Sequence, residues 1–359
     1  MANTSLQEFV ESVNGTSRLR IEEDFGDGFV RLMTSEAERR QAAQDIRSSE
    51  DIVLELLRNA RDAHATHIFV ATSREGANRL LTVIDDGDGI PTAMQQLVFE
   101  PRVTSKLDTS HSDAWGYHGR GMALYSISVN AEEAYVADSA PGLGTALHVR
   151  TNTTSLPERT DQSTFPTFDV VEKGKVNVRG PRNLLRTICE FALDCRSSCI
   201  VYVGTPAEIC SALYTYGMAT LSTIDRLFCD APHQLPLSKR LATASDPYSL
   251  MSLASSFGLS ISERTARRVI DGQVEPANSI LDRITLISSA QNEAKSQPRK
   301  PRLDQRSIRL SKEDKSEIAE AARIAYSAIA ERHFLDSSVE PQVTVKNNRL
   351  LVSIPLIHD

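Results

Sequence analysis

The sequence lacks any long hydrophobic run. Its longest apolar stretches, such as Cys199–Val203, are far shorter than the ~20 residues that a membrane-spanning helix needs. The N-terminal segment Met1–Gly15 is polar and lacks the apolar core of a secretory signal peptide. We therefore expect a cytoplasmic protein that has no membrane partner.

Cysteine is scarce, and its spacing argues against the common zinc sites. The chain has 5 cysteines, an odd number, with no Cys-x-x-Cys pair among them. A structural zinc site needs ligands at tighter, repeated spacing. We interpret the five as reduced packing residues: Cys189, Cys195, Cys199, Cys210 and Cys229.

Glycine and proline are also limited, at 17 and 15 of 359 residues, which excludes a low-complexity chain. With 40% hydrophobic and 24% charged residues, the composition is that of a globular protein long enough for about two domains. The net charge of -7 argues against a uniformly basic surface for nucleic acid, so any DNA contact must be local.

Periodic patterns predict the first elements. Apolar residues at helical spacing predict a helix over Ser48–Ala65, and Asp51 follows its first residue at the spacing of a capping box. Alternating patterns predict strands at His67–Thr72 and Leu80–Ile84. The glycine-broken turn Asp85–Gly89 therefore comes one hairpin after the helix.

A second glycine cluster follows a polar, irregular segment. Pro91–Trp115 leads to Gly116–Gly121 and then to a helix predicted over Met122–Val129. Glycines before a helix start suit phosphate binding, because bare backbone N–H groups and the helix dipole favour an anion there. This cluster is therefore a candidate phosphate site.

The rest of the chain is expected to complete the sheet and then become helical. After Pro206 we see little strand pattern until the end. The predicted elements are a strand at Gly144–Val149 that ends the first sheet, a polar loop at Thr151–Thr167, a helix at Arg182–Leu193 and a strand at Cys199–Val203.

The C-terminal tail begins with a basic segment. Ser296–Arg309 is rich in basic residues, contains two prolines and is expected to be an exposed linker. Ser311 with Asp314 predicts the start of a last helix. A hairpin, Gln342–Val345 and Arg349–Ile354, is expected to close the chain.

Three polar residues share one face of the first predicted helix. Glu55, Asn59 and Asp62 stand at i, i+4 and i+7, within about 40° of one line along the helix. Burial of these groups without ligands would cost on the order of 1–3 kcal/mol each. Charge stripes usually face solvent, so the stripe alone fits either a solvated face or a ligand site.

Four short segments carry a stronger signal together. They are Glu-Leu-Leu-Arg-Asn-Ala-Arg-Asp-Ala at Glu55–Ala63, Asp-Asp-Gly-Asp-Gly-Ile at Asp85–Ile90, Gly-Tyr-His-Gly-Arg-Gly at Gly116–Gly121, and Gly144–Thr145. Each is weak alone, but their order over about 90 residues is specific. The set resembles the Bergerat fold of the GHKL superfamily, which includes DNA gyrase-type and type IIB topoisomerases, MutL, the ninety-kilodalton heat-shock chaperones and sensor histidine kinases.

The resemblance implies ATP and Mg²⁺ as ligands and gives single residues their roles. Asn59 would bind Mg²⁺ through its amide oxygen, a hard ligand for a hard cation. Glu55 would orient and deprotonate the attacking water. Asp85 would accept the adenine amino hydrogen and so select adenine over guanine. Thr145 would support that contact directly or through water.

The other nucleotide-binding candidates belong to the glycine turn and to a lid over the triphosphate. Backbone N–H groups of the lid and the Lys106 charge would cover the phosphates, although Lys106 and Arg120 could equally face solvent. Asp62 could brace the motif helix, and His118 could be a spacer. The full set is Asp62, Gly87, Gly89, Ile90, Thr104, Ser105, Lys106, Gly116, His118, Gly119, Arg120, Gly121 and Met122.

Sensor histidine kinases share the run from Val98 to Lys106, so a kinase is an alternative. Those kinases place a phospho-accepting histidine before the nucleotide domain, whereas the first histidine here is His64, inside the motif helix. Glu55 also suits hydrolysis better, because a base aimed at water wastes the phosphoryl group. A histidine or serine protein kinase and a chaperone-like ATP switch stay open beside an ATPase.

Other segments of the chain resemble two branches of the superfamily. Asp62–Val70 is similar to MutL after the first motif, and Arg182–Val203 resembles the B subunit of type IIB topoisomerases. Ser252–Ile270, predicted as two helices around a glycine turn, matches the place of a helix-two-turn-helix insert in that subunit. It is either a DNA-reading unit, with Arg264, Arg267 and Arg268 on the second helix, or an ordinary helical hairpin.

The resemblance implies an α+β fold, a two-layer α/β sandwich with a mixed sheet, followed by a mostly helical C-terminal region. The expected function is Mg²⁺-dependent ATP binding with slow hydrolysis in a nucleotide-gated dimerisation clamp. Expected partners are a second copy of the chain when ATP is bound, a separate protein, and DNA through residues 262–268 and 295–309. The expected domains are an N-terminal segment (1–19), an ATP-binding domain (20–205), a helical domain (206–294), a basic linker (295–310) and a C-terminal helix and hairpin (311–359).

Overall fold

The chain divides into two compact units, residues 1–290 and 291–359. Within the described residues, no helix is long and apolar enough to cross a membrane. The computed structural model describes residues 21–105, 111–113, 116–118, 121–159, 161–171, 175–227, 229, 231–284, 311–333, 335–336, 338–346 and 349–357.

A five-stranded mixed sheet forms the centre of the first unit. Its strand order is β12-β3-β4-β9-β8, with β12 parallel to β3 and all other neighbours antiparallel. Alternate residues of the middle strands contribute to different apolar cores, so both faces of the sheet are covered. The strands are β3 (His67–Glu75), β4 (Asn78–Asp85), β8 (Glu133–Ser139), β9 (Thr145–Asn152) and β12 (Ile200–Gly204).

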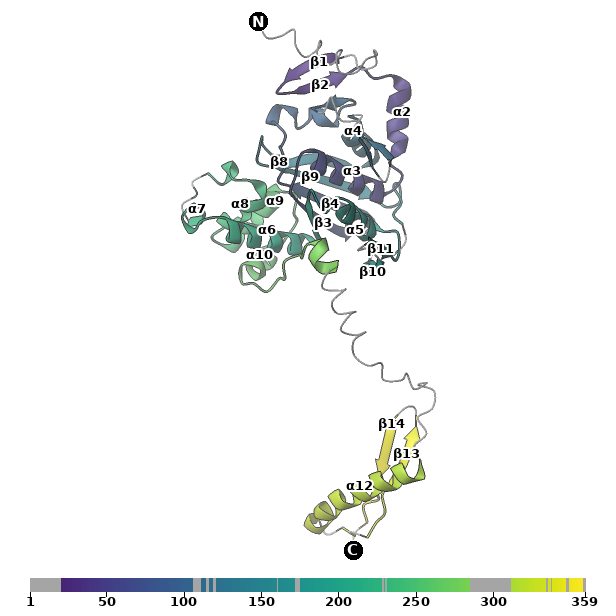
Figure 1. The fold of residues 1–359 in the computed structure, drawn as a ribbon. Helices are drawn as coiled ribbons and strands as arrows, with labels where there is room; N and C mark the ends of the chain where they lie inside the picture. Colours follow the sequence, from purple (N-terminus) through teal and green to yellow (C-terminus); the bar gives the residue numbers. More distant parts are fainter. Residues whose placement is uncertain are drawn as a thin grey trace. The chain divides into compact units, whose positions relative to one another are not determined.

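Helices α3 (Ser49–Asp62) and α5 (Leu184–Asp194) lie on one face of this sheet (Figure 1). The two helices pack against each other and share a core with the sheet, to which α3 contributes Ile52 and Leu56. Helix α4 (Ala123–Asn130) also contacts α3. The helices predicted in these three places are confirmed.

The predicted capping box of α3 is wrong, because neither of its two hydrogen bonds is formed. Ser48 is the N-cap residue, but its side chain accepts no backbone hydrogen bond. Its hydroxyl donates to the Asp51 carboxylate at 3.2 Å, and the Arg47 amide donates to the same carboxylate at 2.9 Å. The Ser48 hydroxyl thus acts as a donor, and the Asp51 carboxylate is the side-chain group that accepts a backbone hydrogen bond at the start of the helix.

The opposite face of the sheet carries the helical region predicted after Pro206. Phe69 and Ile84 of the sheet share an apolar core with Leu213, Leu250 and Phe257. The α+β class, with a mixed sheet and a helical region behind it, is therefore confirmed, and the boundary predicted near residue 205 lies inside one compact unit. The helices are α6 (Pro206–Thr220), α7 (Thr223–Leu227), α8 (Leu237–Arg240), α9 (Pro247–Ser256) and α10 (Glu263–Ile270).

The structure corrects the expected end of the sheet. The strand predicted at Gly144–Val149 does not end the sheet, because β8 pairs with its outer side. β8 was not predicted, since its short run begins with the charged residue Glu133 and carries another, Asp138, next to its last residue. Other elements outside the predictions are β1 (Ile21–Gly26), β2 (Phe29–Leu32), α2 (Glu36–Asp45), β5 (Val103–Thr104), β6 (His111–Asp113), β7 (Gly116–His118), β10 (Thr167–Val171) and β11 (Lys175–Arg179).

The second unit contains a long helix and a hairpin. Helix α12 (Lys312–His333) packs against β13 (Gln342–Lys346), which pairs with β14 (Arg349–Ser353). The amide of Asp314 donates to the Ser311 hydroxyl at 3.0 Å, as the predicted helix start requires. The basic linker predicted at 295–310 lies outside the described residues.

Candidate nucleotide-binding site

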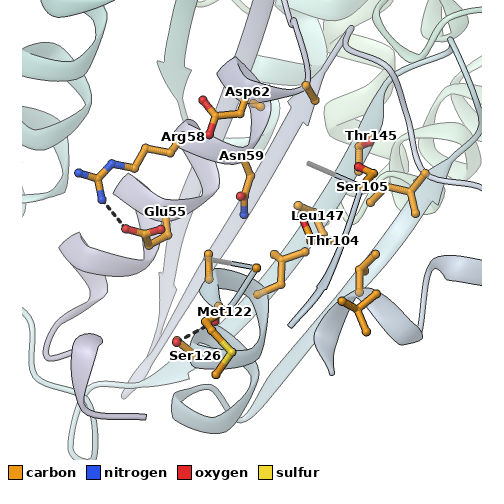
Figure 2. Close-up of a pocket in the computed structure, with 18 of the residues that line it drawn as sticks. Glu55, Arg58, Asn59, Asp62, Thr104, Ser105, Met122, Ser126, Thr145 and Leu147 are labelled. Atoms are coloured by element: carbon orange, nitrogen blue, oxygen red, sulfur yellow. Dashed lines mark hydrogen bonds and ion pairs between the residues drawn. The ribbon is translucent and has the colours of Figure 1, made fainter. Parts of the chain in front are cut away.

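The polar face of α3 lies over a cavity of about 570 Å³ on the same side of the sheet. Figure 2 shows Glu55 and Asn59 extending from the helix toward the opposite wall, where Thr104 and Met122 lie. Predicted site residues from separate segments therefore meet in one place. Those that line the cavity are Glu55, Asn59, Asp62, Asp85, Gly89, Ile90, Thr104, Ser105, Gly121, Met122 and Thr145.

Asp85 and Thr145 lie side by side at one end of the cavity. Asp85 is the last residue of β4, Thr145 is the first of β9, and the two are direct partners in the antiparallel register. Each is only 4% exposed. The Asp85 carboxylate accepts a hydrogen bond of 2.9 Å from the Gly87 amide, so Gly87 holds the carboxylate from behind although it does not line the cavity.

Two glycines allow the backbone to pack tightly around this end. Gly89 has φ +75°, and a Cβ there would lie 1.9 Å from the Ala140 carbonyl oxygen. Gly144 has φ +90°, and a Cβ there would lie 2.0 Å from the Asp85 carbonyl oxygen. A side chain at either position would push the turn after β4 away from the loop before β9. The cavity end therefore needs glycine at both positions.

Charged partners hold the carboxylates of α3. Arg58 donates to Glu55 at 2.5 Å, with side chains that are 7% and 21% exposed respectively. Arg61 donates to Asp62 at 3.0 Å. The site thus presents carboxylates whose positions are set by arginines of the same helix.

The opposite wall comes from β5 and the start of α4. Thr104 ends β5, which pairs with β2. Met122 is the N-cap residue of α4, and its carbonyl accepts hydrogen bonds from the Ser126 amide and hydroxyl, both at 2.8 Å. Gly116 and His118 lie in β7, paired with β6, without described side chains. Lys106, Gly119 and Arg120 lie outside the described residues.

Three further polar residues contact the predicted ones, and sequence reasoning did not single them out. Arg58 stands three residues after Glu55, a spacing that could have indicated the ion pair. Ser139 ends β8 and lies opposite Thr145 in the register of β8 and β9. Asp86 follows Asp85 directly. For Ser139 no local signal exists, because its neighbour Thr145 is brought to it only by strand pairing.

Asp86 fastens the turn after β4 to the start of β3. Its carboxylate accepts hydrogen bonds from the amides of Thr66 and His67, both at 2.7 Å, from the Thr66 hydroxyl at 2.7 Å, and it lies 3.0 Å from His67 Nδ1. Burial raises the pKa of this carboxyl, but the hydrogen bonds from His67 and Thr66 outweigh burial and lower the pKa to about 2. Asp86 is therefore a structural carboxylate beside the predicted binding carboxylate.

The donors in the cavity do not make a metal site by themselves. Among the described residues, no group of three or more histidine, cysteine, aspartate or glutamate side chains could hold a metal ion. Mg²⁺ commonly keeps several waters and takes one or two protein oxygens together with substrate phosphates. The oxygen ligands of this cavity fit an ion that arrives with a nucleotide.

Residues 44–155 match the family model described as "Histidine kinase-, DNA gyrase B-, and HSP90-like ATPase". This segment is a GHKL ATPase domain. It contains α3, the glycine turn, β9 and every predicted site residue from Glu55 to Thr145. A GHKL ATPase domain implies ATP binding.

Curated relatives named "DNA mismatch repair protein MutL" are similar to part of the chain. The protein of Lactiplantibacillus plantarum is 35% identical over 117 residues, which are 32% of this chain and 17% of the relative. The protein of Staphylococcus aureus strain Newman is 33% identical over 115 residues, 31% of this chain and 17% of the relative. The aligned segment thus spans about a sixth of the length of these relatives.

Proposed function

We propose that the protein binds ATP with Mg²⁺ in the cavity between α3 and the sheet and hydrolyses it slowly. The observation that carries the proposal is the convergence of Glu55 and Asn59 of α3 with Asp85 of β4 on one cavity. The GHKL domain over residues 44–155 supports ATP as the nucleotide. Neither observation depends on the other.

Asp85 and Thr145 form the end of the cavity that would receive adenine. A carboxylate is an acceptor only, and it therefore pairs with the adenine amino group and not with the guanine carbonyl. Burial of Asp85 to 4% exposure makes a mismatched partner costly, because the carboxylate loses water without gaining a hydrogen bond. This end would select the base.

The polar face of α3 would meet the phosphates. Asn59 would hold Mg²⁺ through its amide oxygen, and the bound ion would neutralise phosphate charge. Glu55 would accept a proton from the attacking water as general base. Thr104, Ser105 and the start of α4 would line the triphosphate from the opposite wall, together with the predicted lid residues.

Phosphate release by Glu55→Gln protein tests the hydrolysis step. We expect turnover to fall by at least about 100-fold, since general bases contribute roughly 10²–10⁴-fold, while ATP affinity stays within a few-fold of wild type. Glu36→Gln, in the exposed first turn of α2, is the control and should keep wild-type turnover. Wild-type turnover in Glu55→Gln protein would remove Glu55 from the base role.

The clamp is the finer part of the proposal. ATP would bring two copies of the chain together, and hydrolysis would release them, as the GHKL resemblance implies. Sedimentation with and without a non-hydrolysable ATP analogue tests this step. A dimer that forms only with the analogue supports the clamp, and a monomer under both conditions contradicts it.

Association with DNA is proposed for residues 262–268 and 295–309. In α10, Ala266 and Val269 are buried whereas Arg264, Arg267 and Arg268 are exposed. Arg267 lies 3.9 Å from the Glu263 carboxylate, so Arg264 and Arg268 are the main candidates to meet phosphates. MutL-named relatives support a link to DNA. ATP-dependent, salt-sensitive DNA retention tests it. Transfer of labelled phosphate to protein would favour the kinase, and absence of both would favour a chaperone-like switch.

A further inference from the structure

Three polar residues form a row across neighbouring strands at the base end of the cavity. Asp85 of β4 pairs with Thr145 of β9, and Thr145 pairs with Ser139 of β8. Directly opposite residues of antiparallel strands point to the same face. All three are at most 5% exposed. Asp85 and Thr145 line the cavity, and Ser139 stands behind Thr145.

The Ser139 hydroxyl makes three hydrogen bonds with only one proton. It accepts from the Ile90 amide at 2.7 Å and donates to the Gly144 carbonyl at 2.9 Å. A third contact, 3.1 Å long, joins it to the Thr145 hydroxyl. Because a carbonyl cannot donate, the serine proton must go to Gly144. All three bonds exist together only if Thr145 donates its proton to Ser139.

These three hydrogen bonds together determine where the Thr145 hydroxyl proton points. With its proton directed at Ser139, the Thr145 hydroxyl offers only lone pairs to the cavity. Asp85 is likewise an acceptor. The base end then presents two acceptors, and it lacks the rotatable donor that an unrestrained threonine would supply. A ring with an amino group fits such a wall, and a ring with a carbonyl oxygen at the same position meets repulsion and loses its water.

We propose that Ser139 is a specificity-determining positioning residue, which sets the direction of the Thr145 hydroxyl so that the cavity takes 6-amino purine nucleotides and rejects 6-oxo purine nucleotides. The inference rests on the proposed ATP site. Ser139 acts through Thr145 and not by touching the nucleotide. Its removal would therefore change the choice between nucleotides more than the affinity for ATP.

Binding of ATP and of inosine triphosphate, which carries oxygen at position 6, tests the proposal. We expect wild type to prefer ATP by at least about 100-fold, as buried hydrogen-bonding sites reject mismatched groups strongly. Ser139→Ala should lower this preference about tenfold, mainly through tighter binding of inosine triphosphate, because a freed Thr145 can donate to its oxygen. Ser211→Ala, which removes another buried hydroxyl bonded to a carbonyl, is the matched control and should keep the wild-type preference.

A double variant separates positioning from general loosening of the structure. If Ser139 acts through Thr145, the Ser139→Ala/Thr145→Val protein should have the same preference as Thr145→Val alone. Folded Ser139→Ala protein with the wild-type preference, or a double variant that loses markedly more than Thr145→Val, would overturn the proposal.

The test holds even if Ser139→Ala fails to fold. Thr145→Ser keeps a hydroxyl beside Ser139 and should keep the wild-type preference, whereas Thr145→Val should lower it several-fold. A wild-type preference in Thr145→Val protein would contradict the role of the hydroxyl. Wild-type protein that binds neither nucleotide would instead contradict the proposed ATP site, so the two failures are distinguishable.

Discussion

The two ends of the cavity are built in different ways. At the base end, Asp85, Thr145 and Ser139 come from three paired strands and are almost fully buried. At the other end, Glu55 and Asn59 stand on one helix, and the Glu55 side chain is 21% exposed. A buried end held by strand pairing suits recognition of the base, and a more exposed end suits a reaction with water. Binding and turnover should therefore be separable by mutation.

The largest effect is expected at the base end. Asp85→Asn replaces an acceptor with a group that also donates, and it faces the adenine amino group with the wrong polarity. We expect ATP affinity to fall by at least about 100-fold, measured by calorimetry. Asp225→Asn, on an exposed carboxylate of α7 that does not line the cavity, should change affinity far less. An equal loss of ATP affinity in the two variants would contradict the specific role of Asp85 at the base end.

Backbone packing at the base end gives the next effect. Gly144→Ala places a Cβ 2.0 Å from the Asp85 carbonyl at φ +90°, so we expect a loss of about 2–4 kcal/mol in the free energy of unfolding, from strain and displaced backbone.

Gly142→Ala is the matched control for this substitution. Gly142 also has positive φ, +73°, but nothing lies within 4 Å of its Cβ position, so only about 1 kcal/mol of strain is expected. Denaturant unfolding measures both variants. A stable Gly144→Ala protein would mean that this end is not rigid.

Much of the site could be predicted from sequence because its signals are local. Glu55, Asn59 and Asp62 share a helix face by spacing alone, and Asp85 lies in a glycine turn directly after a strand. Ser139 could not be found in this way, because only the pairing of β8 with β9 brings it to Thr145. The packing of the helical region on the sheet could not be predicted for the same reason. The Thr82 hydroxyl donates a hydrogen bond of 2.9 Å to the Gly258 carbonyl, and these two residues are far apart in the chain.

A smaller effect is expected at the end of the cavity that α3 forms. Asn59→Ala removes the amide proposed to hold Mg²⁺, so the affinity for ATP with Mg²⁺ should fall about tenfold, while the affinity in the presence of a chelator should not change. Titrations under both conditions measure the difference. An equal loss with and without Mg²⁺ would show that Asn59 contacts the nucleotide itself.

The smallest effect concerns acid stability of the base end. The pKa of Asp86 is lowered to about 2 in the folded protein, so its stabilisation is complete above about pH 4 and is lost as pH falls toward 2. We expect wild type to lose about 1 kcal/mol more than Asp86→Asn over this range, by denaturant unfolding at each pH. An identical pH dependence in the two proteins would contradict the anchoring role of this carboxylate.

Calorimetric titration of the folded protein with ATP and Mg²⁺ tests the central claim most directly. We predict saturable binding at one site per chain, which Asp85→Asn abolishes and Glu55→Gln preserves. Absence of binding heat and of measurable affinity in wild-type protein that is well folded would contradict the account.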